Sequence, residues 1–375
     1  MKVLLTGGGT GGHVYPAIAI AEAFAAEPAF APLELLFVGM RGGLETEIVA
    51  KAGLRAEYVS AAPLLRKFSF ALFRTIFSNL AGFFQAQGIL RRFRADVAVA
   101  TGGYVTFPVL AALWTRKMLR LSRARIALLE PNAQPGLTNR LLRPLVDEVW
   151  LGVDGGTRAL ARGEYMTGTP VRAAFAKPLA AAEARRALGL DAAATTIVVF
   201  GGSQGARRLN EAVSALALEG LPAGWQILLV SGTRDYDAVE RRMGAAGVPH
   251  VRLVPYLDDP SPAFAAADLV VARSGASTLA ELAATGTAAL LVPYPYATGD
   301  HQTENAAVVE RCGAARVIAD RDLDGRRLRA ELEAALVPTA FASLRGAARA
   351  RAVGDPRRAI VARVKTWTAQ KAGQP

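Results

Sequence analysis

The feature that most constrains the fold is a strand, a glycine-rich loop and a helix that follow one another twice along the chain. Near the N-terminus an apolar run leads into Thr6-Gly7-Gly8-Gly9-Thr10-Gly11-Gly12-His13 and then into an Ala/Ile-rich helical pattern. In the second half, the apolar residues 195–200 lead into Gly201-Gly202-Ser203-Gln204-Gly205-Ala206 and a second helical pattern. The N–H groups of such a loop, at a helix N-terminus, bind anions. Two α/β domains of similar build that hold a ligand between them explain the repeat.

The first loop is distinct from a dinucleotide-binding fingerprint. No strand ending in an acidic residue follows it at the usual spacing of about 20 residues. Pro16 fits the first turn of the following helix, where its missing N–H is not needed. His13, one of only three histidines, stands at the exit of the loop. A simple turn from strand to helix explains one such loop equally well, so the repetition carries the argument.

Length and strand pattern indicate two α/β domains. A chain of 375 residues with 52% hydrophobic residues is long for one core. Helical patterns separate the candidate strands, which predicts parallel βα units. A boundary is expected near residues 166–172. The candidate strands are residues 2–6, 33–38, 97–100, 126–129 and 148–151, then 195–200, 226–230, 251–254, 269–272 and 289–292.

Cysteine and histidine usage narrows the chemistry. One cysteine, Cys312, excludes an intramolecular disulfide, and we interpret it as a core residue. Three histidines and one cysteine leave too few soft ligands for a structural zinc site. Because an apolar run begins at residue 3, no signal peptide is expected.

A basic and aromatic segment spans residues 64–125. It holds eleven of the basic residues against one acid, Asp96, in a chain of net charge +12. No apolar stretch reaches the ~20 residues needed to cross a bilayer. Three interpretations remain open: an internal amphipathic helix, a membrane-surface patch, and a nucleic-acid surface, which the absence of a recognised motif disfavours. The patch would comprise Arg66, Lys67, Phe73, Arg74, Phe77 and Phe84, on a helical face that Leu72, Ile76, Leu80 and Phe83 share.

The second domain contains the densest set of polar candidates. Arg273-Ser274-Gly275-Ala276-Ser277-Thr278 follows a strand, and Glu281 lies one turn into the next helix. A glutamate there can accept hydrogen bonds from ribose hydroxyls, although a helix-capping cluster is the simpler alternative. Gln302, in Asp300-His301-Gln302, is expected at the same edge of the sheet. Asp320-Arg321-Asp322 imitates a metal-binding D-x-D, but we interpret it as a solvated loop.

These motifs, in this order and with Gly102-Gly103-Tyr104-Val105 between the first two, resemble glycosyltransferase family 28 over roughly residues 1–370. Within this family the chain closely resembles the peripheral-membrane N-acetylglucosaminyltransferases of bacterial peptidoglycan synthesis. The resemblance implies an α/β GT-B fold of two Rossmann-like domains. Residues 1–168 would bind acceptor and membrane, residues 169–352 would bind UDP-GlcNAc, and residues 353–375 would cross back as a helix.

The resemblance also implies the activity and its setting. GlcNAc would pass with inversion from UDP-GlcNAc to undecaprenyl-pyrophosphoryl-MurNAc-pentapeptide (lipid I), giving lipid II. The enzyme would lie on the cytoplasmic face of the cell membrane, with an anionic lipid surface and the cell-wall and division machinery as partners. Neither nucleic acid nor a metal or other cofactor would be needed.

Site residues follow from matching motifs. Ser203 and Arg172 would lie near the diphosphate, Leu257 near uracil, and Glu281 on the ribose. Gln302 would bind the GlcNAc hydroxyls, and Tyr104 would face the acceptor. Ala276, Ser277 and Thr278 would line phosphates and ribose, while Thr10, Gly11, Gly12, His13 and Asn132 would face the sugar from the first domain.

Two departures from the family pattern bear on this assignment. Leu129-Glu130-Pro131-Asn132 stands where the family usually has His-Glu-Gln-Asn, and Thr169 replaces the Asn before Pro-Val-Arg. His13 is the best-suited base for the acceptor hydroxyl, since the ordinary pKa of histidine is near 6.5. Helix N-termini after the second glycine loop and at Ala276 would stabilise the leaving diphosphate.

Three other functions stay open at this point. A diacylglycerol glucosyltransferase would share the two domains and the membrane patch but should lack His13 in this loop. A UDP-GlcNAc epimerase would have no use for the basic aromatic segment. A nucleotide-binding module without catalysis would bind UDP-GlcNAc and leave lipid I unchanged.

Overall fold

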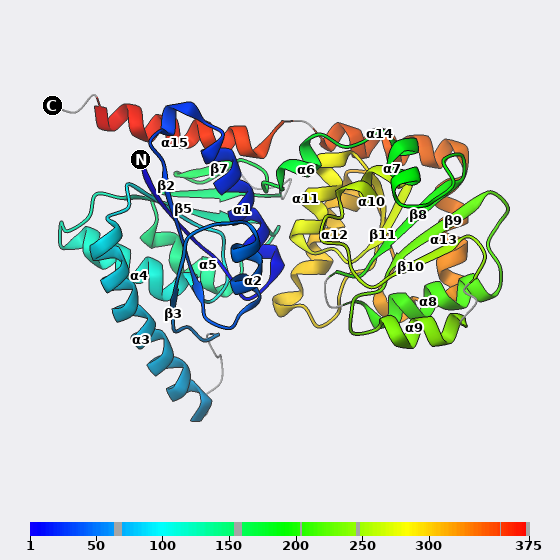
Figure 1. Ribbon diagram of the computed structural model, residues 1–375, viewed down its shortest axis with the longest axis horizontal. Helices are drawn as coiled ribbons and strands as arrows, with labels where there is room; N and C mark the ends of the chain where they lie inside the picture. The colour runs from blue at the N-terminus through cyan, green and yellow to red at the C-terminus, as the bar shows by residue number, and fades with distance from the viewer. Residues whose placement is uncertain (64–69, 154–159, 203–204, 245–247, 353, 373–375) are drawn as a thin grey trace. The chain divides into compact units, whose positions relative to one another are not determined.

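The computed structural model describes residues 1–63, 70–153, 160–202, 205–244, 248–352 and 354–372. The chain divides into two compact units (Figure 1). Unit 1 is Met1–Arg172 with Gly354–Pro375, and unit 2 is Ala173–Val353. Each unit is built on one parallel sheet, as the alternation of strand and helix patterns predicts.

Unit 1 has a seven-stranded sheet of order β3-β2-β1-β4-β5-β6-β7. The short edge strands β3 and β7 were not predicted, because each carries a glutamate and lacks a continuous apolar run. The strands are β1 Lys2–Thr6, β2 Glu34–Met40, β3 Ala56–Val59, β4 Val97–Ala100, β5 Arg125–Glu130, β6 Glu148–Leu151 and β7 Glu164–Met166. The helices are α1 Gly11–Ala25, η1 Pro28–Phe30, α2 Leu44–Lys51, α3 Phe70–Phe93, α4 Thr106–Met118, α5 Leu137–Leu142, η2 Arg143–Leu145 and α15 Pro356–Ala372.

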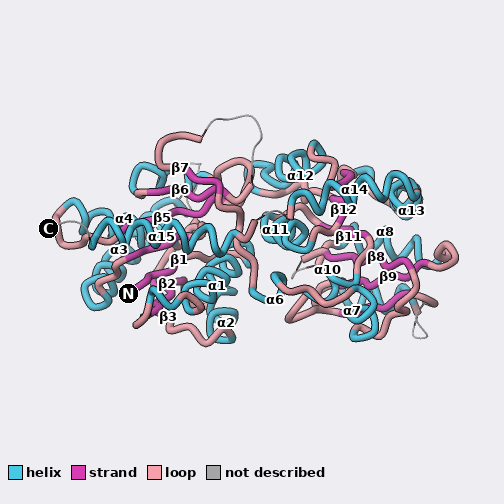
Figure 2. The backbone as a smooth tube through the Cα atoms, turned by 90° about the horizontal axis from the view of Figure 1, so that it is seen from above, coloured by secondary structure: helices cyan, strands magenta, loops and turns pink. Residues whose placement is uncertain are grey.

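Successive side chains of the strands supply two cores, one on each face of this sheet. Val3 and Leu5 pack with α1 and with Ile360 of α15, whereas Leu4 packs with residues of α3 and α4 such as Leu90. This alternation is the period-two pattern of a strand buried on both faces. Figure 2 shows α15, the last helix of the chain, lying beside α1 on unit 1.

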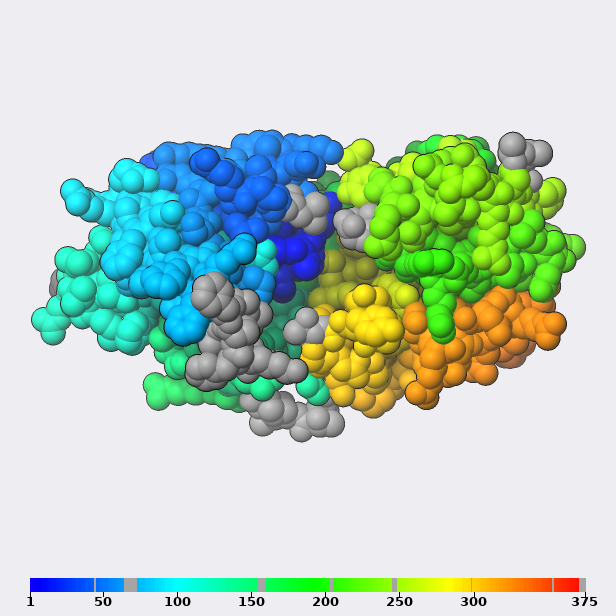
Figure 3. All heavy atoms as spheres, turned by 90° about the horizontal axis from the view of Figure 1, so that it is seen from below, coloured from blue at the N-terminus to red at the C-terminus, as the bar shows by residue number. Residues whose placement is uncertain are grey.

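Unit 2 repeats the architecture with a six-stranded sheet of order β10-β9-β8-β11-β12-β13. Helix α13 packs against α8 (Figure 3, orange beside green). The strands are β8 Thr195–Phe200, β9 Trp225–Val230, β10 Val251–Val254, β11 Leu269–Ala272, β12 Ala288–Leu291 and β13 Ala315–Val317, of which β13 was not predicted. The helices are α6 Ala173–Ala176, α7 Ala181–Ala187, α8 Arg207–Leu218, α9 Tyr236–Met243, α10 Ser261–Ala266, α11 Ala276–Thr285, η3 Thr298–Asp300, α12 His301–Arg311, η4 Asp320–Asp322, α13 Gly325–Leu336 and α14 Pro338–Arg351.

Two expectations about the fold are wrong. Pro16 is not in the first turn of α1, which begins at Gly11, so His13 belongs to the helix rather than to the loop. The N–H groups of His13 and Val14 both bond to Thr10 O, at 3.1 and 3.3 Å, and this early bonding starts the helix ahead of Pro16. Cys312 is exposed after the end of α12 rather than packed in a core.

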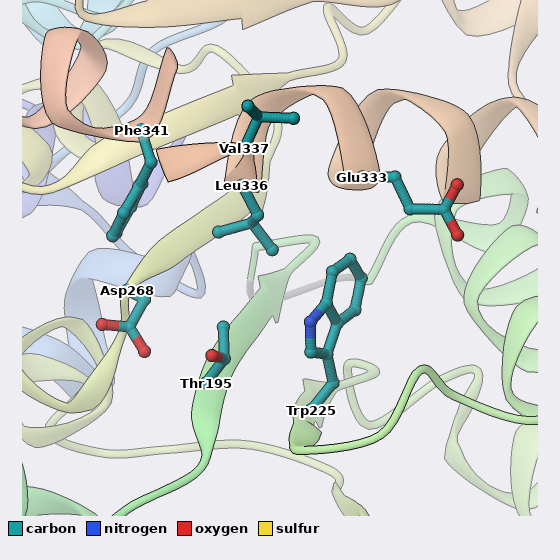
Figure 4. A pocket seen from close by; sticks show the side chains of 7 residues that line it. All are labelled: Thr195, Trp225, Asp268, Glu333, Leu336, Val337 and Phe341. Atoms are coloured by element: carbon teal, nitrogen blue, oxygen red, sulfur yellow. The ribbon is translucent and has the colours of Figure 1, made fainter. Parts of the chain in front are cut away.

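A pocket in unit 2 lies at the opposite end of the strands from the glycine loop (Figure 4). Thr195 and Trp225, the first residues of β8 and β9, form its floor with Asp268. Side chains around the junction of α13 and α14, including Leu336 and Phe341, complete the lining. Because ligands of such sheets bind at the carboxyl ends of the strands, this pocket is separate from the candidate site.

Candidate active site

The order of strands reverses once in each sheet, between β1 and β4 in unit 1 and between β8 and β11 in unit 2. Open parallel sheets bind ligands beyond the carboxyl ends of the strands at such a point. The two glycine loops follow β1 and β8, and the segments beginning Gly102 and Arg273 follow β4 and β11. Both sets of motifs are therefore brought to the reversal of their own sheet.

In unit 1 the two glycine turns touch through their backbones. Gly8 N donates to Gly102 O at 3.3 Å. Gly103 has a φ of +88°, and a Cβ there would lie 2.1 Å from Gly8 O. Only glycine allows this approach, so the first loop is held in place by the turn that carries Tyr104.

His13 is fixed by two hydrogen bonds to Thr101, the residue after β4. Its Nδ1 lies 2.9 Å from Thr101 O, and Thr101 Oγ1 donates to His13 O at 2.6 Å. A carbonyl oxygen only accepts, so Nδ1 carries the proton and Nε2 is the basic nitrogen of the neutral ring. The imidazole is thus oriented as a general base requires.

Glu45 is a site residue that the sequence reasoning missed. This buried carboxylate of α2 accepts from Gly9 N at 3.2 Å and from Met40 N at 3.1 Å. The ring of Tyr104 lies against Gly9, the residue whose N–H group Glu45 accepts from. Burial, and secondarily the charge of Glu45, raise the pKa of the Tyr104 hydroxyl. The only signal for Glu45 was an acid two residues after the Gly42-Gly43 pair.

Glu130 is a second missed residue, and it holds Asn132 in place. One oxygen, Oε1, accepts from Asn132 N at 3.0 Å and from Asn132 Nδ2 at 3.1 Å. The other oxygen accepts from Asn139 Nδ2 at 2.8 Å. Burial raises the pKa of Glu130 although these hydrogen bonds oppose the shift. Leu129, the residue that departs from the family pattern, is fully buried in the core.

In unit 2 the first turns of α11 carry Ala276, Ser277, Thr278 and Glu281. Ala276 and Glu281 are buried, the others half-buried. Ser277 Oγ is buried and has no hydrogen-bond partner among the described residues. Buried hydroxyls without a partner are rare in native proteins, so this atom marks a place for a polar ligand.

Gln302 lies in the first turn of α12, beside the α11 segment. Its Oε1 accepts from Tyr294 N at 2.9 Å, and its carbonyl accepts from Ser274 Oγ at 2.7 Å. Asn305 Nδ2 donates to Ser274 O at 3.2 Å. These bonds bring together the loops after β11 and β12, as the sequence predicts for neighbouring strands.

Several predicted residues lie elsewhere or outside the described part. Ser203, Arg66 and Lys67 fall outside the described residues. Arg172 is in unit 1, with its guanidinium 4.7 Å from the ring centroid of Tyr15. Leu257, half-buried, follows the edge strand β10.

The expectation of a solvated loop at Asp320-Arg321-Asp322 holds only in part, because Arg321 and Asp322 are exposed but Asp320 is not. The motif forms η4, and Asp320 pairs with Arg273, with 2.6 Å between Oδ1 and Nη1. The local sequence could not predict this environment of Asp320, because Arg273 and Arg208 come from distant segments of the chain. Within the described ranges, no group of three or more His, Cys, Asp or Glu residues could hold a metal ion.

Between Phe73 and Phe84, α3 presents an aromatic face to solvent. Phe73, Phe77 and Phe84 are 58, 68 and 65% exposed, whereas Thr75 and Asn79 are buried. Asn79 Nδ2 donates to Ala62 O at 3.0 Å on the inner side. The interpretation as an internal helix is therefore wrong for this part of α3, and the helix projects from unit 1 in Figure 1. Ile76 and Leu80 are exposed as well, but Phe83 packs against the core.

No helix of the described residues is both long and apolar enough to span a membrane.

Two family models match the chain in order. Residues 3–151 match the glycosyltransferase family 28 N-terminal domain, and residues 196–353 match the family 28 C-terminal domain. The chain belongs to glycosyltransferase family 28. Family 28 relatives include the UDP-N-acetylglucosamine--N-acetylmuramyl-(pentapeptide) pyrophosphoryl-undecaprenol N-acetylglucosamine transferases of Halothermothrix orenii and Caldanaerobacter subterraneus. The first is 39% identical over 88% of both chains, the second 36% identical over 98% of this chain and 100% of the relative.

Solved structures establish the GT-B fold of this family 28 chain. The crystal structure of Acinetobacter baumannii MurG matches with a TM-score of 0.74 and 24% identity, over 97% of this chain and 99% of that one. UDP-GlcNAc 2-epimerase from Neisseria meningitidis matches with a TM-score of 0.66 and 12% identity, over 98% and 100%. Because an epimerase shares the fold, the fold alone does not separate transferase from epimerase.

Proposed function

We propose that this chain transfers GlcNAc from UDP-GlcNAc to lipid I, forming lipid II with inversion at the anomeric carbon. The single observation that carries the proposal is the full-length similarity to relatives named for this reaction. It favours the transferase over the epimerase and over a diacylglycerol glucosyltransferase. The arrangement of both glycine loops at the strand reversals supports it.

The donor is assigned mainly to unit 2. Ser277 Oγ, which has no hydrogen-bond partner among the described residues, supports a ligand at the start of α11. Ala276, Thr278 and Ser203 complete the diphosphate and ribose site in this assignment, with Glu281 on the ribose, Leu257 near uracil and Arg172 near the diphosphate. Gln302, whose Oε1 is already bonded to Tyr294 N, would present its amide NH2 group to the sugar hydroxyls.

His13 is assigned as the general base, and Thr10, Gly11, Gly12 and Asn132 as residues that face the sugar. In the reaction, His13 Nε2 takes the proton of the acceptor hydroxyl while its oxygen attacks the anomeric carbon. The bond from that carbon to the diphosphate breaks, and UDP leaves with the electron pair. The orientation of the ring by Thr101 supports this role. Tyr104, on the turn beside the first loop, is assigned to the acceptor side.

A metal ion is not required in this proposal. In this assignment the N-termini of α8, which begins at Arg207, and of α11, which begins at Ala276, would lie near the diphosphate. Helix N-termini stabilise developing negative charge. The transfer should therefore proceed in EDTA.

The exposed aromatic face of α3 is assigned to the cytoplasmic membrane surface, where the lipid acceptor lies. Phe73, Phe77 and Phe84 would enter the interface, and Arg66, Lys67 and Arg74 would meet anionic headgroups. Arg74 is exposed beside Phe73. The cell-wall and division machinery is the expected set of protein partners, an expectation that rests on the resemblance alone.

The test is a transfer assay with labelled UDP-GlcNAc and lipid I, with and without EDTA. Lipid II should form at equal rates in both. Conversion of UDP-GlcNAc to its epimer without acceptor would favour the epimerase, and binding without turnover would favour a nucleotide-binding module. Loss of activity in EDTA that Mg²⁺ restores would overturn the metal-independent step alone.

A further inference from the structure

We propose that Asp320 is a positioning residue for the donor sugar. It holds Arg273, which fixes the segment after β12, and this segment orients the side-chain amide of Gln302. The inference rests on the proposed function, in which Gln302 binds GlcNAc. It gives a role to the Asp-x-Asp motif of the sequence without a metal.

The first step is an ion pair that is largely shielded from solvent. Arg273 Nη1 lies 2.6 Å from Asp320 Oδ1, and the two side chains are only 12 and 14% exposed. Loss of one partner would leave the other charge poorly hydrated, so the pair fixes the position of the guanidinium. A guanidinium is planar and directs its N–H groups along set directions.

The second step links this guanidinium to the segment after β12. Arg273 Nη1 also lies within hydrogen-bond distance of two carbonyl oxygens, 3.1 Å from Val292 O and 3.2 Å from Pro293 O. Its guanidinium carbon is 5.6 Å from the ring centroid of Tyr294. Arg273 thus contacts three successive residues of one segment.

The third step leads from that segment to the sugar site. Tyr294 N donates to Gln302 Oε1 at 2.9 Å, which sets the rotation of the amide and hence the direction of its NH2 group. Ser274, the neighbour of Arg273, bonds to the carbonyl of the same Gln302 at 2.7 Å. Displacement of Arg273 would therefore act on Gln302 through both of its bonds.

The two acids of the motif differ in their surroundings. Asp320 also meets Arg208 of α8, with 3.6 Å between Oδ2 and Nε, and its carbonyl accepts from Arg208 Nη1 at 2.8 Å. The Asp322 side chain is 58% exposed, and it pairs with the exposed Arg321, with 3.7 Å between Oδ1 and Nε. Asp322 is thus a matched control, two positions along in the same short helix.

The experiment compares Asp320→Asn with Asp322→Asn in the full chain. Asparagine keeps the shape of the carboxylate and removes its charge. We measure kcat and KM with UDP-GlcNAc and with its C4 epimer UDP-GalNAc, and the affinity for UDP alone. In Asp320→Asn the preference for UDP-GlcNAc should fall about tenfold, mainly through KM, as for coupled neighbours in a network. UDP affinity should change less than about threefold, and Asp322→Asn should behave like the wild type within about twofold.

Unchanged sugar preference in a folded Asp320→Asn protein would overturn the inference, even if its melting temperature fell, because a purely structural residue lowers stability alone. Should Asp320→Asn fail to fold, Arg273→Lys provides the test. Lysine keeps the charge beside Asp320 but lacks the planar fork, and the same loss of preference is expected; an unchanged preference would again contradict the inference. A wild-type protein that transfers no GlcNAc would count against the proposed function instead.

Discussion

The indole Nε1 of Trp367 donates to Glu148 Oε1 at 2.8 Å, although 219 positions separate the two residues. Trp150 Nε1 donates to the other oxygen of the same carboxylate at 2.9 Å, and the two indoles stack with centroids 5.9 Å apart. Arg363 pairs with Glu148 as well. The C-terminal helix α15 is therefore part of the core of unit 1.

Glu148→Ala should lower the free energy of unfolding by about 3 kcal/mol, because it leaves two buried indole N–H groups and Arg363 without their acceptor. Urea denaturation followed by tryptophan fluorescence measures this. Glu34→Ala, which removes an exposed pair with Lys2, is the control and should cost at most about 1 kcal/mol. Equal effects of the two changes would mean that α15 is not held through Glu148.

His13→Ala should lower turnover by about 10²–10⁴-fold, the usual contribution of a general base. UDP affinity should stay close to that of the wild type, since the donor is assigned to unit 2. Steady-state kinetics with lipid I and calorimetric titration with UDP separate the two effects. Near-normal turnover would remove His13 from the mechanism.

Glu281→Ala should weaken UDP binding at least several-fold, because a hydrogen bond to a charged group contributes about 1.5–3 kcal/mol. Titration with UDP measures this change. Glu304→Ala, an exposed acid of the next helix, serves as the control and should leave UDP affinity unchanged. If both variants bind UDP like the wild type, Glu281 does not hold the ribose.

Gln302→Ala should reduce the preference for UDP-GlcNAc over other UDP-sugars while UDP itself still binds. The reason is that its amide is assigned to the sugar hydroxyls and not to the nucleotide. Competition between UDP-GlcNAc and UDP-glucose in the transfer assay gives the preference directly. Undiminished discrimination would show that another residue selects the sugar.

Changing Phe73, Phe77 and Phe84 together to Ser should sharply reduce binding to vesicles that contain anionic lipid. The variant loses apolar insertion into the membrane. Each Lys or Arg near the anionic surface still contributes about 1 kcal/mol to membrane binding, and salt weakens this contribution. Vesicle flotation at low and high salt separates the apolar contribution from the electrostatic one. Leu218→Ser, an exposed apolar residue of unit 2, is the control and should float like the wild type. Equal flotation of the triple variant and the wild type would exclude α3 as the membrane surface.

The local sequence pattern was sufficient to predict much of the fold. The strands β1 and β8 with their glycine loops were predictable, because an apolar run, a glycine turn and a helix start are written in consecutive residues. The short edge strands β3, β7 and β13 were not, since their pairing with a neighbour stabilises them more than their own composition does. Glu45 went unnoticed because Gly9, to which it bonds, comes from a distant loop. The bonds of Glu130 to Asn132 and Asn139 are local, but its residue pattern alone did not assign it a role.

The sequence by itself determined the two α/β domains, the family and the residues that α3 displays together on one side. Only the tertiary structure decided that this side faces solvent, while Thr75 and Asn79 are buried and Asn79 bonds to Ala62. It likewise decided that Asp320 meets Arg273 and that Glu148 meets Trp367. The physical reason is that helical and strand periodicity fix which side chains lie together, whereas the surface that they meet is supplied by segments far away in the sequence.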